Sequence, residues 1–428
     1  MKKAVSVIVA ALLLVTPVQA SESAQTMAEE NAVTGETAAA AELAAWAALD
    51  AAPVEEAVFG METVPVTAAG LEVEAPSAIL MERETGTVIW EKNADTRLEP
   101  ASVTKIMTML LLAEAVDAGS VALTDTAVCS AYASSMGGSQ VFLEENERMT
   151  LSDLLKSVAV SSGNDAAVVI AEHLCGSESA FVARMNQRAA ELGMTGTTFQ
   201  NCTGLPCEGE HLTTARDIAL MSRALLSHTW IREYTTIWMD TIRGGEFGLS
   251  NTNKLIYYYD GATGLKTGFT QSAGYCLSAS AFREDVEYIA VVLNCETSAE
   301  RFESAKQLLS FAFANYTLVD AAPREPIPPI TVELGAQSTV QPAAAERFPV
   351  LVTRNQASSV EISIDLLESV AAPVAEGQEL GTMKVTAGET TVAQIPLLAA
   401  QNVEKLTLWQ IWGRLLQGTF ADVLGKKL

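Results

Sequence analysis

Residues 99–112 read EPASVTKIMTMLLL, a polar segment that runs directly into an apolar one. Proline suits the first turn of a helix, because its missing N–H has no partner there anyway, so the sequence predicts a helix that begins at Pro100. Ser102 and Lys105 then lie one turn apart on the same face of that helix. Since burial lowers the pKa of a lysine, the pair predicts a serine nucleophile beside an amine that can serve as its base.

The chain has 428 residues, 49% of them hydrophobic, which predicts a globular protein of two or three domains. Its formal net charge of −25 argues against nucleic-acid binding, because phosphate groups would repel it. Residues 1–20 combine two lysines, an apolar core and the segment Val18-Gln19-Ala20, as in a secretory signal peptide. We therefore expect residues 1–20 to be an export signal and the mature chain to begin at Ser21.

Residues 21–75 are rich in Ala, Glu, Thr and Val and contain no Lys or Arg. Such an acidic segment buries too little apolar surface to fold alone, so we expect a disordered spacer. Order is expected to begin near Pro76, where residues 77–82 and 87–90 flank the turn 84–86 as a β-hairpin.

Helical patterns follow the hairpin, and strand patterns return only later in the chain. The expected helices cover residues 151–160, 165–174, 180–192 and 300–315, and the later strands cover residues 274–281 and 288–294. Strands at both ends of this segment, with helices between them, predict an α/β domain over residues 76–320. In it, one sheet is assembled from both sequence ends, with a helical region inserted.

Four prolines between residues 323 and 329 mark a domain boundary. Short strand patterns then predict a small β-sandwich-like domain over residues 321–400. In the last segment, residues 401–428, Trp409, Trp412 and several leucines lie on one helical face, and two lysines follow. This pattern predicts an amphipathic helix in a membrane interface, and the alternative is a helix packed against its own domain.

Cys202, Cys207 and His211 lie close together in the sequence but provide only three candidate metal ligands. A disulfide between the two cysteines, or a free pair, is a better interpretation than a zinc site. We expect most of the six cysteines to be small buried apolar residues. The sequence predicts neither a metal nor a cofactor.

Two further short motifs carry chemical groups. Residues 160–165 read VSSGND and join two expected helices, which places a hydroxyl and an amide at a tight turn. Residues 265–270 read LKTGFT and precede an expected strand. There a lysine and a threonine accompany a glycine that permits close approach of the backbone to a ligand. Each motif alone is typical of an ordinary turn.

Together, the S-x-x-K, S-x-N and K-T-G motifs, in this order and at these wide spacings, resemble those of the penicillin-binding and serine β-lactamase superfamily. The chain is more closely similar to the low-molecular-mass D-alanyl-D-alanine carboxypeptidases. Matching stretches include GGS at 137–139, NCTGL at 201–205, HLTTA at 211–215, NTNKL at 251–255 and GLKTGFT at 264–270. The resemblance implies a β-lactamase/transpeptidase-like α/β domain, with an antiparallel sheet flanked by helices and a helical subdomain. A small all-β domain and an amphipathic helix would follow it.

The resemblance also implies a reaction. Ser102 would attack the carbonyl between the two terminal D-alanines of a peptidoglycan stem peptide and form an acyl-enzyme, while Lys105 accepts its proton. Ser162 would pass a proton to the departing amine, and Asn164 would hold Lys105 or the substrate amide. The backbone N–H groups of Ser102 and Phe269 would form the oxyanion hole.

The terminal carboxylate of such a substrate requires a cation and a hydroxyl group, which Lys266 and Thr267 would supply beside Gly268. Lys266 would also help to lower the pKa of Lys105. Arg301 lies where the family places an arginine that binds this carboxylate. Its alternative interpretation is a solvated charge at the start of a helix.

Other functions fit parts of this pattern. A D,D-endopeptidase would use the same nucleophile to cut peptidoglycan cross-links, and an inactive wall-binding protein would have lost motif residues. A class A β-lactamase would carry S-D-N where this chain has Gly163, and it would need a glutamate for deacylation that no segment matches. His211 has a structural role in the family, and three histidines without a suggested Asp partner do not favour a Ser-His-Asp triad.

The expected partners are the peptidoglycan stem peptide, β-lactam inhibitors and, through the terminal helix, a membrane surface. The expected location after export is the outer face of the cytoplasmic membrane, where the protein would be held peripherally.

Overall fold

The computed structural model describes residues 71–343 and 347–413. The predicted signal peptide, most of the predicted spacer and residues 414–428 of the predicted terminal helix lie outside the described residues.

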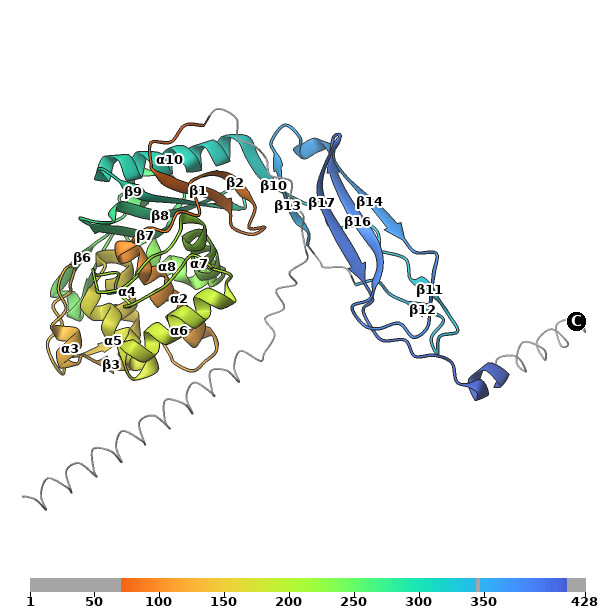
Figure 1. Ribbon diagram of the computed structural model, residues 1–428, viewed down its shortest axis with the longest axis horizontal. Coiled ribbons are helices and arrows are strands. Elements are labelled where there is room, and N and C mark those ends of the chain that lie inside the picture. Colours follow the sequence, from red (N-terminus) through yellow and green to blue (C-terminus); the bar gives the residue numbers. More distant parts are fainter. Residues whose placement is uncertain (1–70, 344–346, 414–428) are drawn as a thin grey trace, which may run out of the picture. The chain divides into compact units, whose positions relative to one another are not determined.

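A five-stranded antiparallel sheet forms the centre of the first part of the chain (Figure 1). Its strands lie in the order β2-β1-β9-β8-β7, so the two ends of the sequence segment meet where β1 pairs with β9. This confirms the prediction of one sheet assembled from both ends. The strands are β1 (Ser77–Glu82), β2 (Val88–Lys92), β7 (Ala262–Thr270), β8 (Gly274–Arg283) and β9 (Val286–Cys295).

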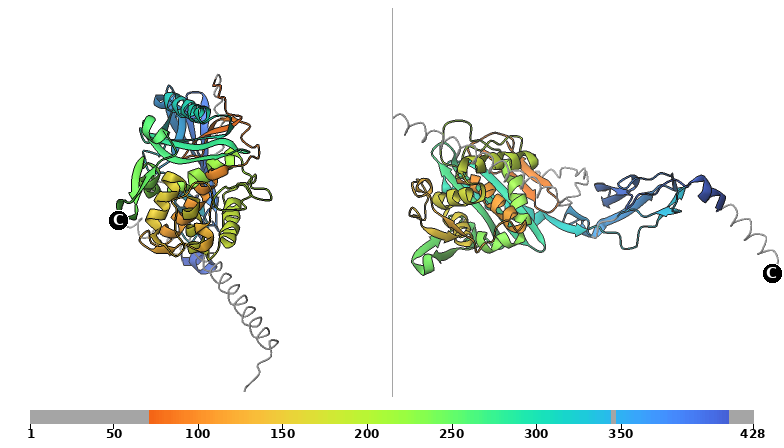
Figure 2. Two further views of the ribbon diagram at one scale, coloured as in Figure 1. Left: turned by 90° about the vertical axis from the view of Figure 1, so that its left-hand side faces the viewer. Right: turned by 90° about the horizontal axis from the view of Figure 1, so that it is seen from below.

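A helical region is inserted between β2 and β7, and it gathers on one side of the sheet (Figure 2). Its longer helices are α2 (Lys105–Asp117), α4 (Leu151–Ser161), α5 (Asn164–Cys175), α6 (Glu178–Glu191) and α7 (Ala215–Ser227). Thr150, Ser177 and Thr214 cap three of these helices, because each side chain accepts a bond from the third N–H that follows it.

Short elements connect these helices. They are η1 (Ala101–Thr104), β3 (Thr126–Val128), α3 (Ala131–Ser134), β4 (Arg148–Thr150), η2 (Thr229–Ile231), α8 (Arg232–Thr235), β5 (Met239–Ile242), η3 (Arg243–Gly245), β6 (Phe247–Ser250) and α9 (Leu255–Tyr258).

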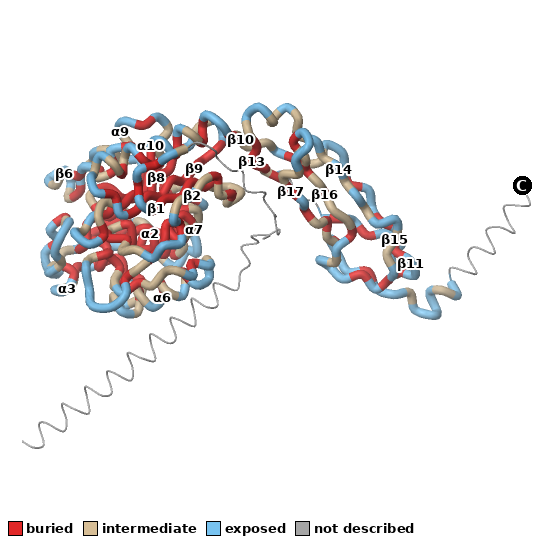
Figure 3. Tube along the Cα trace, turned by 45° about the horizontal axis from the view of Figure 1, so that its top comes forward, coloured by how far each residue is buried: buried red, intermediate tan, exposed pale blue. Residues whose placement is uncertain are grey.

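Helices cover both faces of the sheet. The helix α10 (Ser298–Asn315) packs on one face, where Leu308 and Leu309 share an apolar cluster with Leu277 and Tyr288. The helix α7 packs on the other face, and α2 packs against α7. Burial on both faces explains why β1 and β9 are almost wholly apolar instead of alternating. Figure 3 shows the buried residues concentrated in these strands and in α2.

Three local predictions need correction. The helix at Pro100 is a 3-10 turn, η1, and the α-helix begins only at Lys105. The LKTGFT segment precedes a strand, β8, as predicted, but it also forms a strand itself, because it lies inside β7 and pairs with β8. Order begins before Pro76, since Val73 and Ala75 are buried and Val73 accepts a bond from Lys92 through its carbonyl. The alternation of Leu71, Val73 and Ala75 could have indicated this.

The second part of the chain is β-rich, as predicted, and two apolar clusters hold it together. Its elements are β10 (Tyr316–Asp320), β11 (Ile330–Glu333), β12 (Thr339–Val340), β13 (Pro349–Thr353), η4 (Ala357–Ser359), β14 (Val360–Leu366), β15 (Ser369–Ala371), β16 (Glu379–Ala387) and β17 (Thr390–Leu398). Two of its sheets contain three strands each, in the orders β14-β16-β17 and β12-β11-β15.

Residues 401–407, expected to belong to the terminal helix, are not helical. Val403 is buried and forms a β-bridge with Val374, so this segment completes the β-rich part. A helix begins at Leu408, where the side chain of Thr407 accepts a bond from the N–H of Gln410. Within the described ranges, no single helix has the length and hydropathy to cross a membrane; only the bent pair of α5 and α6 reaches those limits together.

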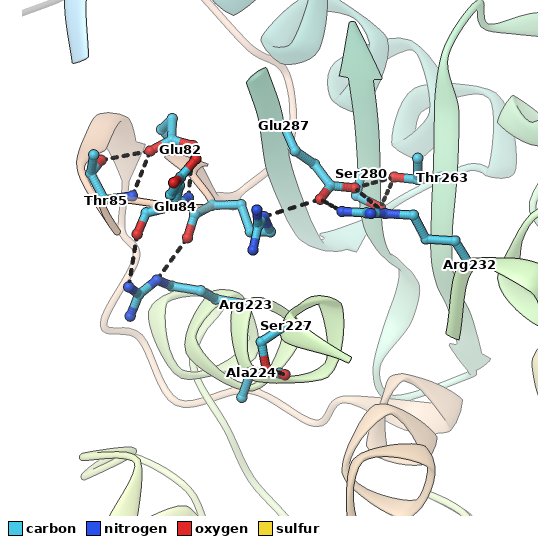
Figure 4. Close-up of polar contacts among 11 residues, drawn as sticks. Glu82, Glu84, Thr85, Arg223, Ala224, Ser227, Arg232, Thr263, Ser280 and Glu287 are labelled. Carbon is cyan, nitrogen blue, oxygen red and sulfur yellow. Dashed lines mark hydrogen bonds and ion pairs between the residues drawn. The ribbon is translucent and has the colours of Figure 1, made fainter. Parts of the chain in front are cut away.

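A buried polar network anchors the beginning of β7 (Figure 4). The carboxylate of Glu287 on β9 is fully buried and accepts a bond of 2.6 Å from Thr263 on β7. It also pairs with Arg232 on α8 and with Arg83, whose Nε lies 3.2 Å away. Thr263 is bonded in turn to Ser280 on β8 at 2.8 Å. One carboxylate therefore ties three strands and a helix together.

We expect Glu287→Ala to lower the free energy of unfolding by about 3–5 kcal/mol, because it leaves two guanidinium groups without their shared carboxylate. Chemical denaturation followed by circular dichroism measures this change. Asp260→Asn is the control, since Asp260 pairs with Arg283 but its side chain is 93% exposed, and it should leave the unfolding midpoint unchanged. Equal midpoints for all three proteins would contradict the role of Glu287.

Candidate active site

Ser102 and Lys105 face each other at the start of α2. The Nζ atom of Lys105 lies 3.0 Å from the Oγ atom of Ser102 and 2.7 Å from the carbonyl oxygen of Thr203. Lys105 is fully buried, whereas Ser102 keeps partial exposure. The structure therefore places a buried amine against a hydroxyl that a ligand can reach, as the spacing in the sequence predicted.

The backbone around Ser102 is held in an unusual conformation by two glycines. Ala101 has a φ of 48°, in the left-handed region that non-glycine residues rarely adopt. Gly204, with a φ of 79°, lies so close that a Cβ atom there would be 1.8 Å from the carbonyl oxygen of Ala101. Gly268 on β7 packs from another direction, and a Cβ atom there would be 3.1 Å from the nitrogen of Ser102. Only glycine fits at Gly204 without moving the turn that carries Ser102.

Burial sets the charge of Lys105. Desolvation lowers its pKa to about 7, and Asp165 and Cys202 oppose the shift only in part. At neutral pH a large fraction of the amine is therefore unprotonated and able to accept a proton from Ser102. The carbonyl of Thr203 favours the protonated form that would result, because it accepts a hydrogen bond from Nζ.

The turn between α4 and α5 carries Ser162 and Asn164. Ser162 ends α4 with a φ of 64°, and both residues are buried. The Nδ2 atom of Asn164 donates to the carbonyl of Gly137 at 2.6 Å, while its buried Oδ1 atom has no hydrogen-bond partner among the described residues. A buried acceptor of this kind is costly unless a ligand or a neighbour uses it. The helices α4 and α5, which this turn joins, both pack against α2, the helix that carries Lys105.

Asp165 also fixes the loop opposite this turn. Its carboxylate accepts bonds from the N–H groups of Val141, at 3.1 Å, and Leu143, at 3.0 Å. The backbone N–H of Asn164 donates to the carbonyl of Ser139 at 2.7 Å. These bonds hold the GGS stretch at residues 137–139 against the α4–α5 turn.

Lys266 and Thr267 lie on the edge strand β7. Lys266 is buried, and its Nζ atom donates to the carbonyl of Thr267 at 3.0 Å. Burial, and then the charges of Lys105 and Arg301, hold the pKa of Lys266 well below its usual range. Lys266 therefore releases its proton more readily than a lysine in water, and an anion bound beside it would favour its protonated form. The hydroxyl of Thr267 donates to that of Thr252 at 2.7 Å.

Phe269 and Arg301 meet at the end of the same strand. The side chain of Phe269 is 51% exposed and stacks on Tyr275, with ring centroids 4.3 Å apart. Arg301 is buried, so it is not the solvated charge that the sequence left open. Its Nη1 atom donates to the carbonyl of Gly268 at 3.0 Å.

His211 stabilises the turn that carries Ser102. Burial lowers its pKa to about 4, so the ring is neutral at pH 7. The N–H of Gln200 donates to its Nδ1 atom at 3.1 Å, so Nε2 carries the proton and donates to the hydroxyl of Thr104 at 2.8 Å. That hydroxyl donates to the carbonyl of Ala101 at 2.8 Å. His211 thus stabilises η1 through Thr104.

The cysteines near this site are free thiols. Cys202 is buried and Cys207 is exposed, so the structure has the free pair and not the disulfide. The carbonyl of Cys202 accepts a bond of 2.7 Å from Thr108 on α2.

Some groups in the site were not identified from the sequence. The NCTGL and NTNKL stretches were noted as matches, but no role was assigned to the carbonyl of Thr203 or the hydroxyl of Thr252. A carbonyl is present in every residue, so the identity of residue 203 gives no signal of this contact. The glycine that follows it, Gly204, was the available signal of close backbone approach.

Comparisons with known proteins identify the class to which this fold and site belong. The family model described as D-alanyl-D-alanine carboxypeptidase matches residues 63–297. The model of the penicillin-binding protein 5 C-terminal domain matches residues 325–405.

Individual relatives agree with these matches. The D-alanyl-D-alanine carboxypeptidase DacF of Bacillus subtilis is 41% identical over 337 residues, which cover 78% of this chain and 86% of that protein. The crystal structure of penicillin-binding protein 5 from Haemophilus influenzae is similar with a TM-score of 0.73 at 27% identity, over 79% of this chain and 100% of that one. Penicillin-binding protein D2 from Listeria monocytogenes, in its cefotaxime-bound form, covers 57% of this chain and 98% of its own, with a TM-score of 0.53 at 32% identity.

The chain therefore belongs to the D-alanyl-D-alanine carboxypeptidase family of penicillin-binding serine hydrolases. The β-lactamase/transpeptidase-like fold that the three motifs implied is confirmed.

Proposed function

We propose that this protein removes the terminal D-alanine from peptidoglycan pentapeptide stems through an acyl-enzyme on Ser102. The single observation that carries this assignment is the 3.0 Å contact between the hydroxyl of Ser102 and the buried amine of Lys105. In its neutral form this amine can accept the proton of Ser102 as the oxygen attacks the carbonyl between the two D-alanines.

The departing D-alanine needs a proton on its nitrogen. Ser162 is the proposed donor, because its hydroxyl can pass on the proton that Lys105 has taken from Ser102. Asn164 offers an unpartnered buried Oδ1 atom that can accept a bond from the substrate amide or from the protonated Lys105. Water then attacks the acyl-enzyme, and the same amine serves as the base for this second step.

Binding of the substrate carboxylate is assigned to β7. Lys266 supplies a cation, and the hydroxyl of Thr267 can turn from Thr252 to the carboxylate. Gly268 permits the turn that carries Ser102 to pack against the strand. The N–H groups of Phe269 and Ser102 serve as the oxyanion hole. Arg301 is proposed to contribute charge to the same region. β-Lactams would enter the site as analogues of this substrate, since their ring carbonyl presents the same target to Ser102.

We further propose that the protein is exported and attached peripherally to the outer face of the membrane. At the start of its terminal helix, Leu408, Trp409 and Trp412 are 76%, 87% and 62% exposed. Large apolar side chains on one helix, left in water, favour insertion into a lipid interface. The signal-peptide pattern of residues 1–20 supports export.

The acyl-enzyme is tested by comparing the full chain with Ser102→Ala and with Ser227→Ala, a control that removes an exposed serine hydroxyl elsewhere. We expect wild type and Ser227→Ala to release D-alanine from a pentapeptide and to gain the mass of one penicillin. Ser102→Ala should do neither, while keeping its circular dichroism spectrum. Equal labelling of Ser102→Ala would remove Ser102 from its role. Faster cleavage of a cross-linked peptide dimer than of the pentapeptide would instead support an endopeptidase.

The role of Lys105 is tested by the pH dependence of penicillin acylation. Because the reactive form is the neutral amine with a pKa of about 7, the acylation rate constant should rise about tenfold per pH unit below pH 7 and level off above pH 8. Lys105→Arg should lose at least about 100-fold, since a guanidinium cannot release its proton. A rate that does not change between pH 5 and 8 would contradict a lysine base.

Membrane attachment is tested by truncation. A chain that ends at Leu406 keeps Val403, which is buried in the β-rich part, and lacks the exposed apolar helix. We expect it to remain in solution during sedimentation with anionic lipid vesicles, whereas the full chain sediments with them. Equal sedimentation of the two chains would favour a helix packed against its own domain.

A further inference from the structure

Arg301 is held by groups of the protein itself. Its Nη1 atom donates to the carbonyl of Gly268 at 3.0 Å and, more weakly, to that of Cys276 at 3.4 Å. Its guanidinium also contacts two aromatic rings, with its central carbon 5.3 Å from the centroid of Tyr275 and 4.7 Å from that of Phe302. A charged group that is buried, bonded and stacked in this way has a defined position before any substrate binds.

The peptide between Gly268 and Phe269 connects Arg301 to the nucleophile. A trans peptide is planar, so the carbonyl of Gly268 and the N–H of Phe269 belong to one unit and point in opposite directions. Gly268 pairs with Cys276 on β8, and Arg301 bonds both carbonyls, so the Gly268 carbonyl points toward β8. Because β7 is the edge strand of the sheet, the N–H of Phe269 points toward its open side.

The turn that carries Ser102 packs against β7 at Gly268. A Cβ atom on Gly268 would lie 2.7 Å from the carbonyl oxygen of Pro100 and 3.1 Å from the nitrogen of Ser102. Arg301 therefore binds the carbonyl of the Gly268–Phe269 peptide. The N–H of the same peptide is directed to the region where the reacting carbonyl would bind.

A second tie fixes the same peptide. The ring of Phe269 stacks on Tyr275 with centroids 4.3 Å apart, and Tyr275 also contacts the guanidinium of Arg301. Both the backbone and the side chain of Phe269 are therefore connected to Arg301.

We infer that Arg301 is a positioning residue that orients and polarises the Gly268–Phe269 peptide, so that the N–H of Phe269 stabilises the oxyanion. This inference rests on the proposed acyl-enzyme at Ser102. A cation on the carbonyl withdraws electron density from the amide and makes its N–H a stronger donor. It also prevents the peptide from rotating when negative charge develops. The role differs from carboxylate binding, because it acts on every substrate that acylates Ser102.

The experiment uses two thioester substrates that differ only in whether the leaving thiol carries a carboxylate. The full chain is compared with Arg301→Gln, Arg301→Lys and the control Lys306→Gln, which removes an exposed charge from the same helix. We expect Arg301→Gln to lower the single-turnover acylation rate constant about tenfold on both substrates, with little change in the substrate concentration at half-saturation. Arg301→Lys should recover part of the loss, and Lys306→Gln should match wild type.

A spectroscopic measurement separates this role from a merely structural one. The acyl carbonyl on Ser102, labelled with ¹³C, should stretch at a higher infrared frequency in Arg301→Gln than in wild type, because a weaker oxyanion hole polarises it less. A loss confined to the thioester with a carboxylate, with an unchanged infrared frequency, would overturn the inference and leave Arg301 as a carboxylate ligand. Failure of wild type itself to form the acyl-enzyme would instead overturn the proposed function.

Discussion

The proposed reaction depends on the contact between the hydroxyl of Ser102 and the amine of Lys105. This amine can act as a base because the surrounding fold keeps it buried. A lysine in water is a cation, and only removal from solvent brings its pKa to about 7. Lys105 is the first residue of α2, a helix whose residues are mostly buried. The apolar run that follows EPASVTK buries this helix, and with it the amine at its first residue.

The second constraint is the placement of β7 beside η1. An edge strand has one free side, and here that side carries groups proposed to bind the substrate. Its position is fixed at both ends: Glu287 holds Thr263 at the beginning, and Arg301 holds the carbonyl of Gly268 near the end. Both anchors are buried charges, which are expensive unless fully paired, so their value lies in geometry more than in stability.

Much of the fold could be predicted from the sequence. Apolar runs and helical periodicity gave the hairpin, the later strands and the helices α4, α5, α6 and α10, because these depend on local patterns of burial. The pairing of Ser102 with Lys105 followed from their spacing alone. The 3-10 turn at η1 could not be predicted, because it results from Gly204 packing against Ala101 across a sequence separation of about a hundred residues. The hydrogen-bond partner of Arg301 could not be predicted either, since it is a backbone carbonyl on another element.

These failures have a common physical origin. Sequence motifs report side chains, whereas much of this site is built from backbone: the carbonyl of Thr203 on Lys105, the N–H of Ser102, and the Gly268–Phe269 peptide. Backbone groups are the same in every residue, so the sequence does not distinguish them. The signal it offers is a glycine, whose missing side chain lets another segment pack closely. Gly204 and Gly268 are two such positions, and each lies against the turn of Ser102. In this protein, a glycine that packs beside the nucleophile marks close packing of another backbone segment and not a flexible hinge. Both glycines restrict the conformation of the turn that carries Ser102.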